Sequence, residues 1–236
     1  MTARSNILNP NQIGVVLRGE PTLMSEWVQT WSLRRTTLHV FTIFIGAGLY
    51  GAAMGCWRDP WQGLYVAIKF PLIILLTTLG NGLINGMFAP LLGLNLGFRQ
   101  SMQAVLISFT IAATILGSFS PLVFFLVWNA PAMSAHVAGA YSFIQLTHVI
   151  IIAFAGITAN VRLVQLLQRL SGSIAVSRRV LFTWLTVNLF LGSQLCWILR
   201  PFIGSPGLPV EFLRPDAFKG NFFESVFRSV QYLLFS

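Results

Sequence analysis

Four long stretches without Asp, Glu, Lys or Arg divide the sequence. They hold 22, 29, 62 and 20 residues, and lie between Arg35 and Arg58, Lys69 and Arg99, Arg99 and Arg162, and Arg179 and Arg200. A membrane-spanning helix needs about 20 apolar residues. Three stretches therefore have room for one span each, and the longest has room for two. The longest divides at a polar, proline-containing turn from Asn129 to His136.

The charge-free stretches predict five transmembrane helices, at residues 37–57, 62–88, 102–127, 138–160 and 180–199. Lipid offers the backbone no hydrogen-bond partner, so an open chain crosses a membrane as helices. We predict an all-α polytopic integral membrane protein in three parts. These are an amphipathic cytoplasmic leader at 1–35, a five-helix transmembrane domain at 36–200, and an extracytoplasmic Pro/Gly-rich segment plus amphipathic helix at 201–236.

The basic residues indicate how the chain is oriented. One side of the predicted membrane collects nine of them, namely Arg4, Arg18, Arg34, Arg35, Arg99, Arg162, Arg169, Arg178 and Arg179. In the short loops, which govern orientation, the balance is five against two. We therefore expect the N-terminus in the cytoplasm and the C-terminus outside. This bias explains the net charge of +9 better than nucleic-acid binding, which clusters basic residues on one face.

The two ends of the chain differ from the spans. Residues 11–31 mix apolar and polar side chains and are interrupted by Pro21, which is typical of short segments on a membrane surface. The segment after Arg200 is rich in Pro and Gly. From Asn221 to Phe235 apolar residues return at helical spacing. We expect an amphipathic helix there, at the interface or docked on a partner.

Small residues recur at intervals of four in the first two predicted spans. The series are Ala47, Gly51 and Gly55, with Gly48 and Ala52 beside them, and then Gly82 and Gly86. Such faces let two helices approach closely. They serve either an interface between chains or packing within one chain, and we favour packing within the chain.

Lys69 lies about one helical turn inside the second apolar stretch, just before Pro71. A charge inside a membrane is a functional candidate by default. Lys69 is close to the expected interface, however, so its stem could reach water. We favour this snorkelling arrangement.

Several neutral polar residues fall near the middle of the predicted spans. They are His148 with Gln145 and Thr147 beside it, Asn188, Asn81 and Asn85. Such groups bond between helices or line a solute path. We favour bonds between helices.

The acidic residues exclude several functions. All six lie outside the predicted spans, at Glu20, Glu26, Asp59, Glu211, Asp216 and Glu224. Proton- or sodium-coupled transport generally uses carboxylates inside the membrane. The sequence also lacks HExxH, GxSxG and Walker A motifs. We predict no enzyme and no catalytic, cofactor-binding or metal-binding residue. For Cys56 and Cys196 we favour buried, unreactive thiols, while a disulfide would require both on one side of the membrane.

Two stretches resemble a known group of proteins. The segments Tyr65–Leu72 and Trp197–Pro206 are similar to uncharacterised bacterial polytopic membrane proteins, which are loosely comparable to the Yip1-like family. The resemblance implies about five helices, an amphipathic leader, a bacterial inner-membrane location and a role as a membrane adaptor. It carries over no catalytic residue.

These observations predict a non-enzymatic integral membrane subunit or scaffold of a membrane protein assembly. Its partners would be other membrane proteins, a second copy of the chain and the lipid bilayer, without nucleic acid or cofactor. The alternative is a small channel or permease for an unidentified solute. That alternative requires several central polar groups on a common lumen.

Overall fold

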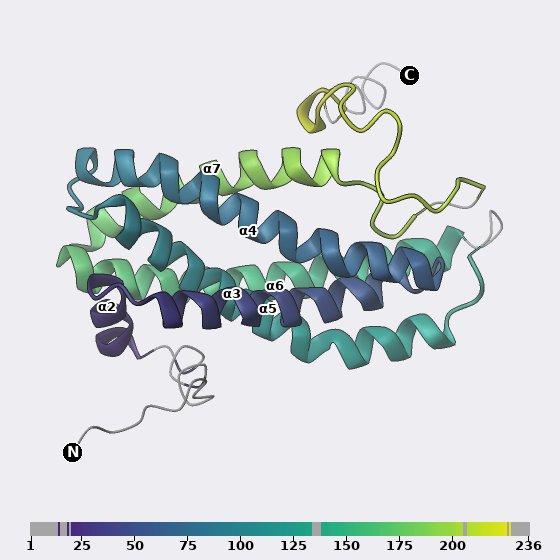
Figure 1. Ribbon diagram of the computed structural model, residues 1–236, viewed down its shortest axis with the longest axis horizontal. Helices are drawn as coiled ribbons and strands as arrows, with labels where there is room; N and C mark the ends of the chain where they lie inside the picture. Colours follow the sequence, from purple (N-terminus) through teal and green to yellow (C-terminus); the bar gives the residue numbers. More distant parts are fainter. Residues whose placement is uncertain are drawn as a thin grey trace.

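Five long helices running side by side make up most of the protein (Figure 1). The computed structural model describes residues 14, 18, 20–133, 138–204, 207–225 and 227. The helices are α3 (Leu33–Gly55), α4 (Pro60–Leu91), α5 (Phe98–Asn129), α6 (Ala138–Ser171) and α7 (Ile174–Ile198). Each is long and apolar enough to cross a membrane. The described residues contain no strand, so the predicted all-α architecture with five spans is confirmed.

The helices begin where the sequence supplies suitable caps. Asp59 precedes Pro60, and its carboxylate accepts a hydrogen bond from the Trp61 backbone N–H at 2.8 Å. A proline in the first turn loses nothing, because that N–H has no partner within the helix. Ser173 caps α7 in a similar way. Gly172 stands immediately before it with a φ of +66°, which a glycine adopts without strain.

The connection between α6 and α7 corrects one prediction. We expected a basic loop over residues 161–179, but α6 continues to Ser171 and α7 begins at Ile174. Arg162 and Arg169 are therefore helical. Charged residues end an apolar stretch without ending a helix, and residues 161–171 contain neither Gly nor Pro.

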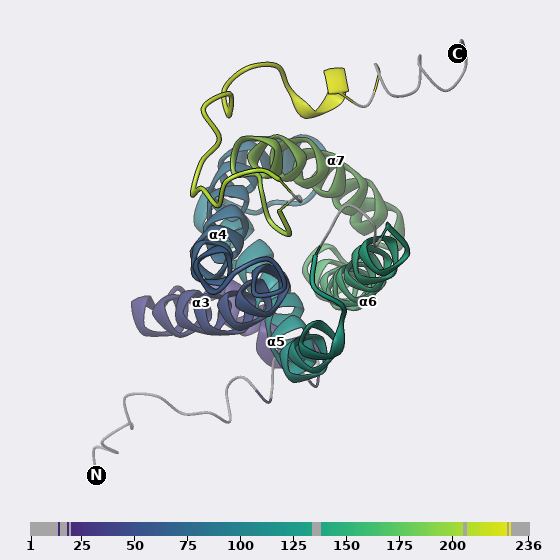
Figure 2. The ribbon, with the colours of Figure 1, turned by 90° about the vertical axis from the view of Figure 1, so that its right-hand side faces the viewer.

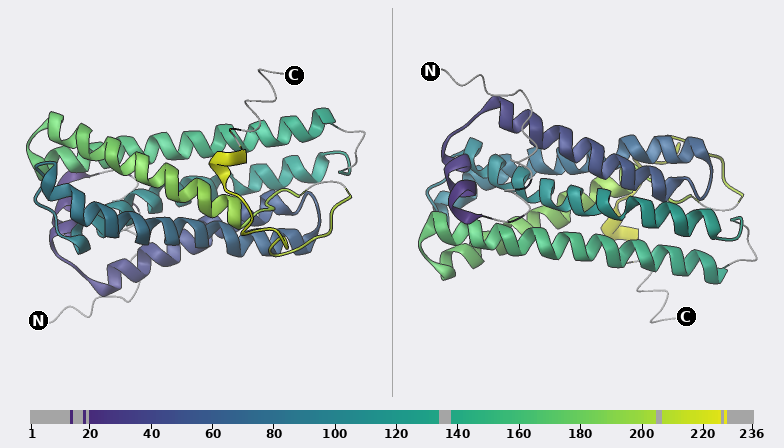
Figure 3. Two further views of the ribbon diagram at one scale, coloured as in Figure 1. Left: turned by 90° about the horizontal axis from the view of Figure 1, so that it is seen from above. Right: turned by 90° about the horizontal axis from the view of Figure 1, so that it is seen from below.

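Four of the helices form a ring and the fifth lies against it. In this ring α4 contacts α5 and α7, and α6 contacts the same two helices, while α3 packs on α4 and α5. Figure 2 shows the arrangement along the helices, and Figure 3 shows them from two further sides. We call the end where α3, α5 and α7 begin the arginine end. The opposite end, where the chain continues after Ile198, is the platform end.

Small residues bring α3, α4 and α5 close together. A Cβ atom added to Gly51 would lie 2.5 Å from the carbonyl oxygen of Val66 on α4. One added to Gly86 would lie 2.8 Å from the Cα of Phe98 on α5, and Gly55 is equally tight against α4. The prediction that these faces pack within the chain is confirmed.

A short helix, α2 (Pro21–Gln29), precedes the bundle at the arginine end. It begins at Pro21, which fits the interruption seen in the sequence. Its apolar side chains Met24 and Val28 are buried and join the main core, and the helix contacts α5 and α6. The amphipathic character expected of the leader is present here, although the apolar face covers protein rather than lipid.

The chain after α7 folds back over the platform end. Leu199, Pro201 and Ala217 are buried there, and most of the segment is irregular. We call residues 199–204 and 207–225 the C-terminal platform. The helix expected from Asn221 to Phe235 is present at residues 222–225 and 227. Residues 226 and 228–236 lie outside the described part of the chain.

Candidate functional site

Lys69 is completely buried beneath the C-terminal platform. Its exposed fraction is 0%, and its Nζ donates a hydrogen bond to the carbonyl oxygen of Pro201 at 3.1 Å. The amine also lies 5.1 Å from the centroid of the Phe212 ring, a favourable position for a cation. No carboxylate among the described residues is within ion-pair distance of it. The prediction that Lys69 snorkels to water is therefore wrong, because the platform covers it.

Gln62 binds the same part of the platform from the same helix. It is 1% exposed, and its Nε2 donates to the carbonyl oxygens of Pro201 at 2.9 Å and Phe202 at 3.0 Å. Gln62 and Lys69 are seven residues apart, which places them on one face of α4. Gln62 was not predicted as a site residue, although its spacing of seven residues from Lys69 was a signal in the sequence.

Further groups hold the middle of the platform. The Arg58 guanidinium donates to the carbonyl oxygen of Leu208 at 3.1 Å, and the Tyr141 hydroxyl donates to that of Gly204 at 3.4 Å. The rings of Tyr65 and Phe212 meet edge-on, with centroids 5.6 Å apart. The α3–α4 turn, α4 and α6 therefore all contribute to fixing this segment.

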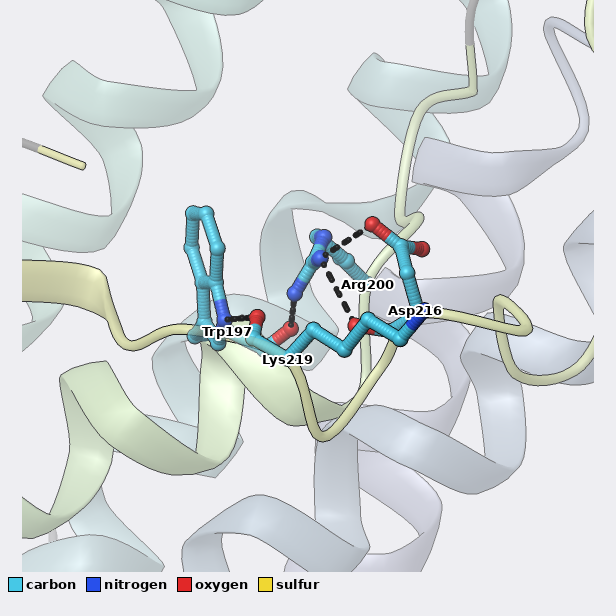
Figure 4. A network of polar contacts seen from close by, with 4 residues as sticks. All are labelled: Trp197, Arg200, Asp216 and Lys219. Carbon is cyan, nitrogen blue, oxygen red and sulfur yellow. Dashed lines mark hydrogen bonds and ion pairs between the residues drawn. The ribbon is translucent and has the colours of Figure 1, made fainter.

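Arg200 organises the outer part of the platform (Figure 4). It forms an ion pair with Asp216 at 3.1 Å and donates to the carbonyl oxygen of Trp197 at 2.6 Å. Its guanidinium stacks on the Trp197 ring, 3.8 Å from the centroid. The indole N–H of Trp197 in turn donates to the carbonyl oxygen of Lys219 at 3.4 Å. These bonds close the loop from Arg200 to Lys219 against the end of α7.

The last part of the platform lies along α7. The Phe222 backbone N–H donates to the side-chain oxygen of Gln194 at 3.3 Å, and the Phe223 ring stacks on that of Phe190 with centroids 5.2 Å apart. Away from α7, the platform carries exposed apolar side chains at Leu208 and Phe218, and Phe227, just beyond the platform, is exposed as well. Phe218 is 80% exposed. A surface of this kind is suited to contact with a partner or with lipid.

Three asparagines form a relay between α4 and α7. Asn85 donates to the side-chain oxygen of Asn81, and Asn81 donates to that of Asn188. Asn81 and Asn85 are both 0% exposed. The prediction that these residues bond between helices is confirmed, because Asn188 belongs to the facing helix.

His148 is separate from this relay. Its Nδ1 lies 2.9 Å from the hydroxyl oxygen of Tyr50, which links α6 to α3. Its neighbour Gln145 is exposed, and Thr147 bonds the carbonyl oxygen of Phe143 in its own helix. The His, Asn and Gln residues considered from the sequence are therefore not gathered at one site.

Both thiols, Cys56 and Cys196, are free and partly buried. Cys56 lies at the end of α3, outside the spans, where burial and then the negative charge of Asp59 raise the pKa of its thiol. Within the described ranges there is no group of three His, Cys, Asp or Glu side chains that could hold a metal ion.

Comparisons with known proteins give no relative from which a function could be transferred. No family model, no curated protein and no solved structure matches the chain. The geometry of the platform and of the buried polar groups is therefore the basis for a functional proposal.

Proposed function

We propose that this protein is a non-enzymatic membrane subunit that presents its C-terminal platform to a partner protein. The observation that carries this proposal is the contrast between the two sides of the platform. Its inner side is bound to the helices by Gln62 and Lys69, whereas its outer side leaves Phe218 80% exposed. Large apolar side chains on a fixed backbone are the groups that contribute most to protein–protein binding.

The way the platform is fixed supports a binding role. Segments that order only on binding lose conformational entropy at that step, which lowers their affinity. Here the backbone carbonyls of Pro201, Gly204 and Lys219 are already bonded to α4, α6 and α7. A partner would therefore meet a pre-organised surface.

The channel or permease alternative has less support. It requires central polar groups on a common lumen, but His148 bonds to Tyr50 while Asn188 bonds to Asn81. At the platform end, Lys69 is buried under the folded segment. These observations favour a subunit that binds through its platform over an open conduit.

On this proposal the arginine end faces the cytoplasm and the platform faces the outside, in a bacterial inner membrane. The support is the set of arginines near the arginine end, at Arg34, Arg35, Arg99, Arg169, Arg178 and Arg179. Basic residues favour the cytoplasmic side of membranes. The adaptor role implied by the Yip1-like resemblance is compatible with this arrangement and stays a prediction.

Site-specific photo-crosslinking tests the proposal. A benzophenone amino acid replaces Phe218, and in a matched chain it replaces Phe182, which is 73% exposed on α7 toward the arginine end. We expect a discrete protein adduct from position 218 in native membranes and none from position 182. The same protein should co-purify in mild detergent, and Phe218→Ser should reduce its recovery.

Three outcomes are informative. An adduct of twice the chain's mass would assign the partner as a second copy of this protein. Equal adducts from both positions would contradict a specific platform interface. Adducts with lipid alone at position 218 would also contradict it, since the platform would then lie on the membrane.

A further inference from the structure

A small cavity lies between α5, α6 and α7, away from the platform contacts. Its volume is about 50 Å³, and its polar lining consists of Ser108, Asn160 and Asn188. One water molecule needs about 10–15 Å³ of cavity volume measured in this way. The cavity therefore has room for about three or four non-hydrogen atoms.

The hydrogen bonds already made by the lining define what is left for an occupant. Asn160 uses one N–H of its Nδ2 to donate to the backbone carbonyl of Gly156 at 2.8 Å, so its Oδ1 and its second N–H remain. Asn188 uses its Oδ1 to accept from Asn81, so both N–H groups of its Nδ2 and one lone pair of its Oδ1 remain. The Ser108 hydroxyl donates to the carbonyl oxygen of Ala159 at 3.4 Å and keeps its lone pairs.

The orientation of Asn160 follows from its partner. A backbone carbonyl can only accept, so the nitrogen of Asn160 must face Gly156. Asn188 is held at the end of the relay from Asn85 and Asn81, which are both completely buried. The cavity thus offers amide donors and amide acceptors from Asn160 and Asn188, together with the hydroxyl oxygen of Ser108.

The lining also excludes charged occupants. No Asp, Glu, Lys or Arg borders the cavity. An ion placed there would lose its hydration without gaining a counter-charge, which is costly. The occupant that matches the remaining groups is neutral and carries both a donor and an acceptor.

We propose that the cavity between α5, α6 and α7 is a binding site for a small neutral molecule of the primary amide or urea class. Its carbonyl oxygen accepts from the Nδ2 of Asn188, and its NH₂ group donates to the Oδ1 of Asn160 and the Oγ of Ser108. Binding of this molecule makes and breaks no covalent bond. The site is independent of the platform interface.

The experiment uses the full chain in lipid nanodiscs and acetamide as the probe. Saturation-transfer NMR measures binding, with empty nanodiscs as the blank and acetone, which has the same number of non-hydrogen atoms as acetamide but no N–H donor, as the comparison ligand. Wild-type protein should give a signal with acetamide and a much weaker one with acetone.

Two glycines on α6 supply a matched pair of variants. A Cβ atom at Gly156, which borders the cavity, or at Gly139, which does not, would meet nothing within 4 Å. Both substitutions to Leu should therefore fold. G156L fills the cavity and should abolish the acetamide signal, while G139L should keep it.

Asn160→Ala tests the hydrogen bond independently of the size of the cavity, because it enlarges the cavity while removing the acceptor. We expect it to weaken acetamide binding by about tenfold, the loss of a typical hydrogen bond. Equal signals from wild type and G156L, equal losses in G156L and G139L, or unchanged binding in Asn160→Ala would each overturn the proposal.

Discussion

The Nζ of Lys69 lies 3.1 Å from the carbonyl oxygen of Pro201, a residue 132 positions further along the chain. The same oxygen accepts a second hydrogen bond from Gln62 at 2.9 Å. One buried backbone acceptor thus joins two side chains of α4 to the start of the platform. Because Gln62 and Lys69 donate to the same oxygen, either side chain can satisfy it when the other is removed.

The shared acceptor predicts a non-additive pair of substitutions. Lys69→Met should cost little, because Pro201 keeps its bond from Gln62 and replacing a buried charge by an apolar group is often neutral. In the double variant with Gln62→Leu, the Pro201 oxygen has no donor. An unsatisfied buried acceptor costs about 1–3 kcal/mol. We expect the double variant to lose that much more stability than the two single variants together.

Thermal unfolding in detergent measures this coupling. Lys219→Met serves as the control, since Lys219 is exposed. Strict additivity of the two single effects would show that the shared carbonyl is not the connection between them.

Gly51→Leu should force α3 and α4 apart. The new Cβ would lie 2.5 Å from the Val66 carbonyl oxygen, a backbone atom that cannot rotate away. Overpacking of this kind costs about 1–3 kcal/mol. The melting temperature in detergent should fall relative to wild type, whereas the matched Gly139→Leu should leave it unchanged. If Gly51→Leu and Gly139→Leu have the same melting temperature, the close approach of α3 and α4 is not important for stability.

Asn81 and Asn188 should show energetic coupling across the α4–α7 contact. Asn81→Leu leaves the Asn188 side-chain oxygen without its donor. Asn188→Leu leaves the Asn81 amide nitrogen without its acceptor, although the Asn81 oxygen still accepts from Asn85. The double substitution removes both groups. Comparable interhelical pairs average about 0.6 kcal/mol in double-mutant cycles, with a maximum of about 1.7 kcal/mol. We expect a coupling in this range from unfolding measurements. A value of zero would argue against the Asn81–Asn188 bond.

Single-cysteine labelling should distinguish the two ends of the bundle. Phe218→Cys and Ile174→Cys are introduced separately after Cys56 and Cys196 have been replaced by Ser. Both positions are exposed, at 80% and 56%. An impermeant maleimide added to intact cells should label position 218 and leave position 174 unmodified. The reverse result would invert the proposed orientation.

The number of spans could be predicted from the sequence because it depends on a local property. A stretch such as residues 36–57 has the length of one span, and no distant residue changes that. The close packing at Gly51 was predictable for a similar reason, since a small residue inside a span has few other uses. The end of α6 could not be predicted in this way, because the charge at Arg162 interrupts the apolar stretch while the helix continues to Ser171.

The site depends on partners that periodicity does not identify. Spacing could place Gln62 and Lys69 on one face of α4, but it could not show that Pro201 covers that face. The partner of His148 is equally distant, since Tyr50 lies 98 residues earlier. Lys69 would have reached water in the absence of the platform, and the sequence gives no signal for the return of the chain over it.

The bond between Lys69 and Pro201 also has a consequence for biosynthesis. When Lys69 is added to the growing chain, the carbonyl that will bind it is still 132 residues from being made. At about 5–20 residues per second, that interval lasts about 7–26 s. During this time the ammonium group must stay at the membrane surface or bind another molecule. A nascent chain that stops before Pro201 never acquires this partner for Lys69.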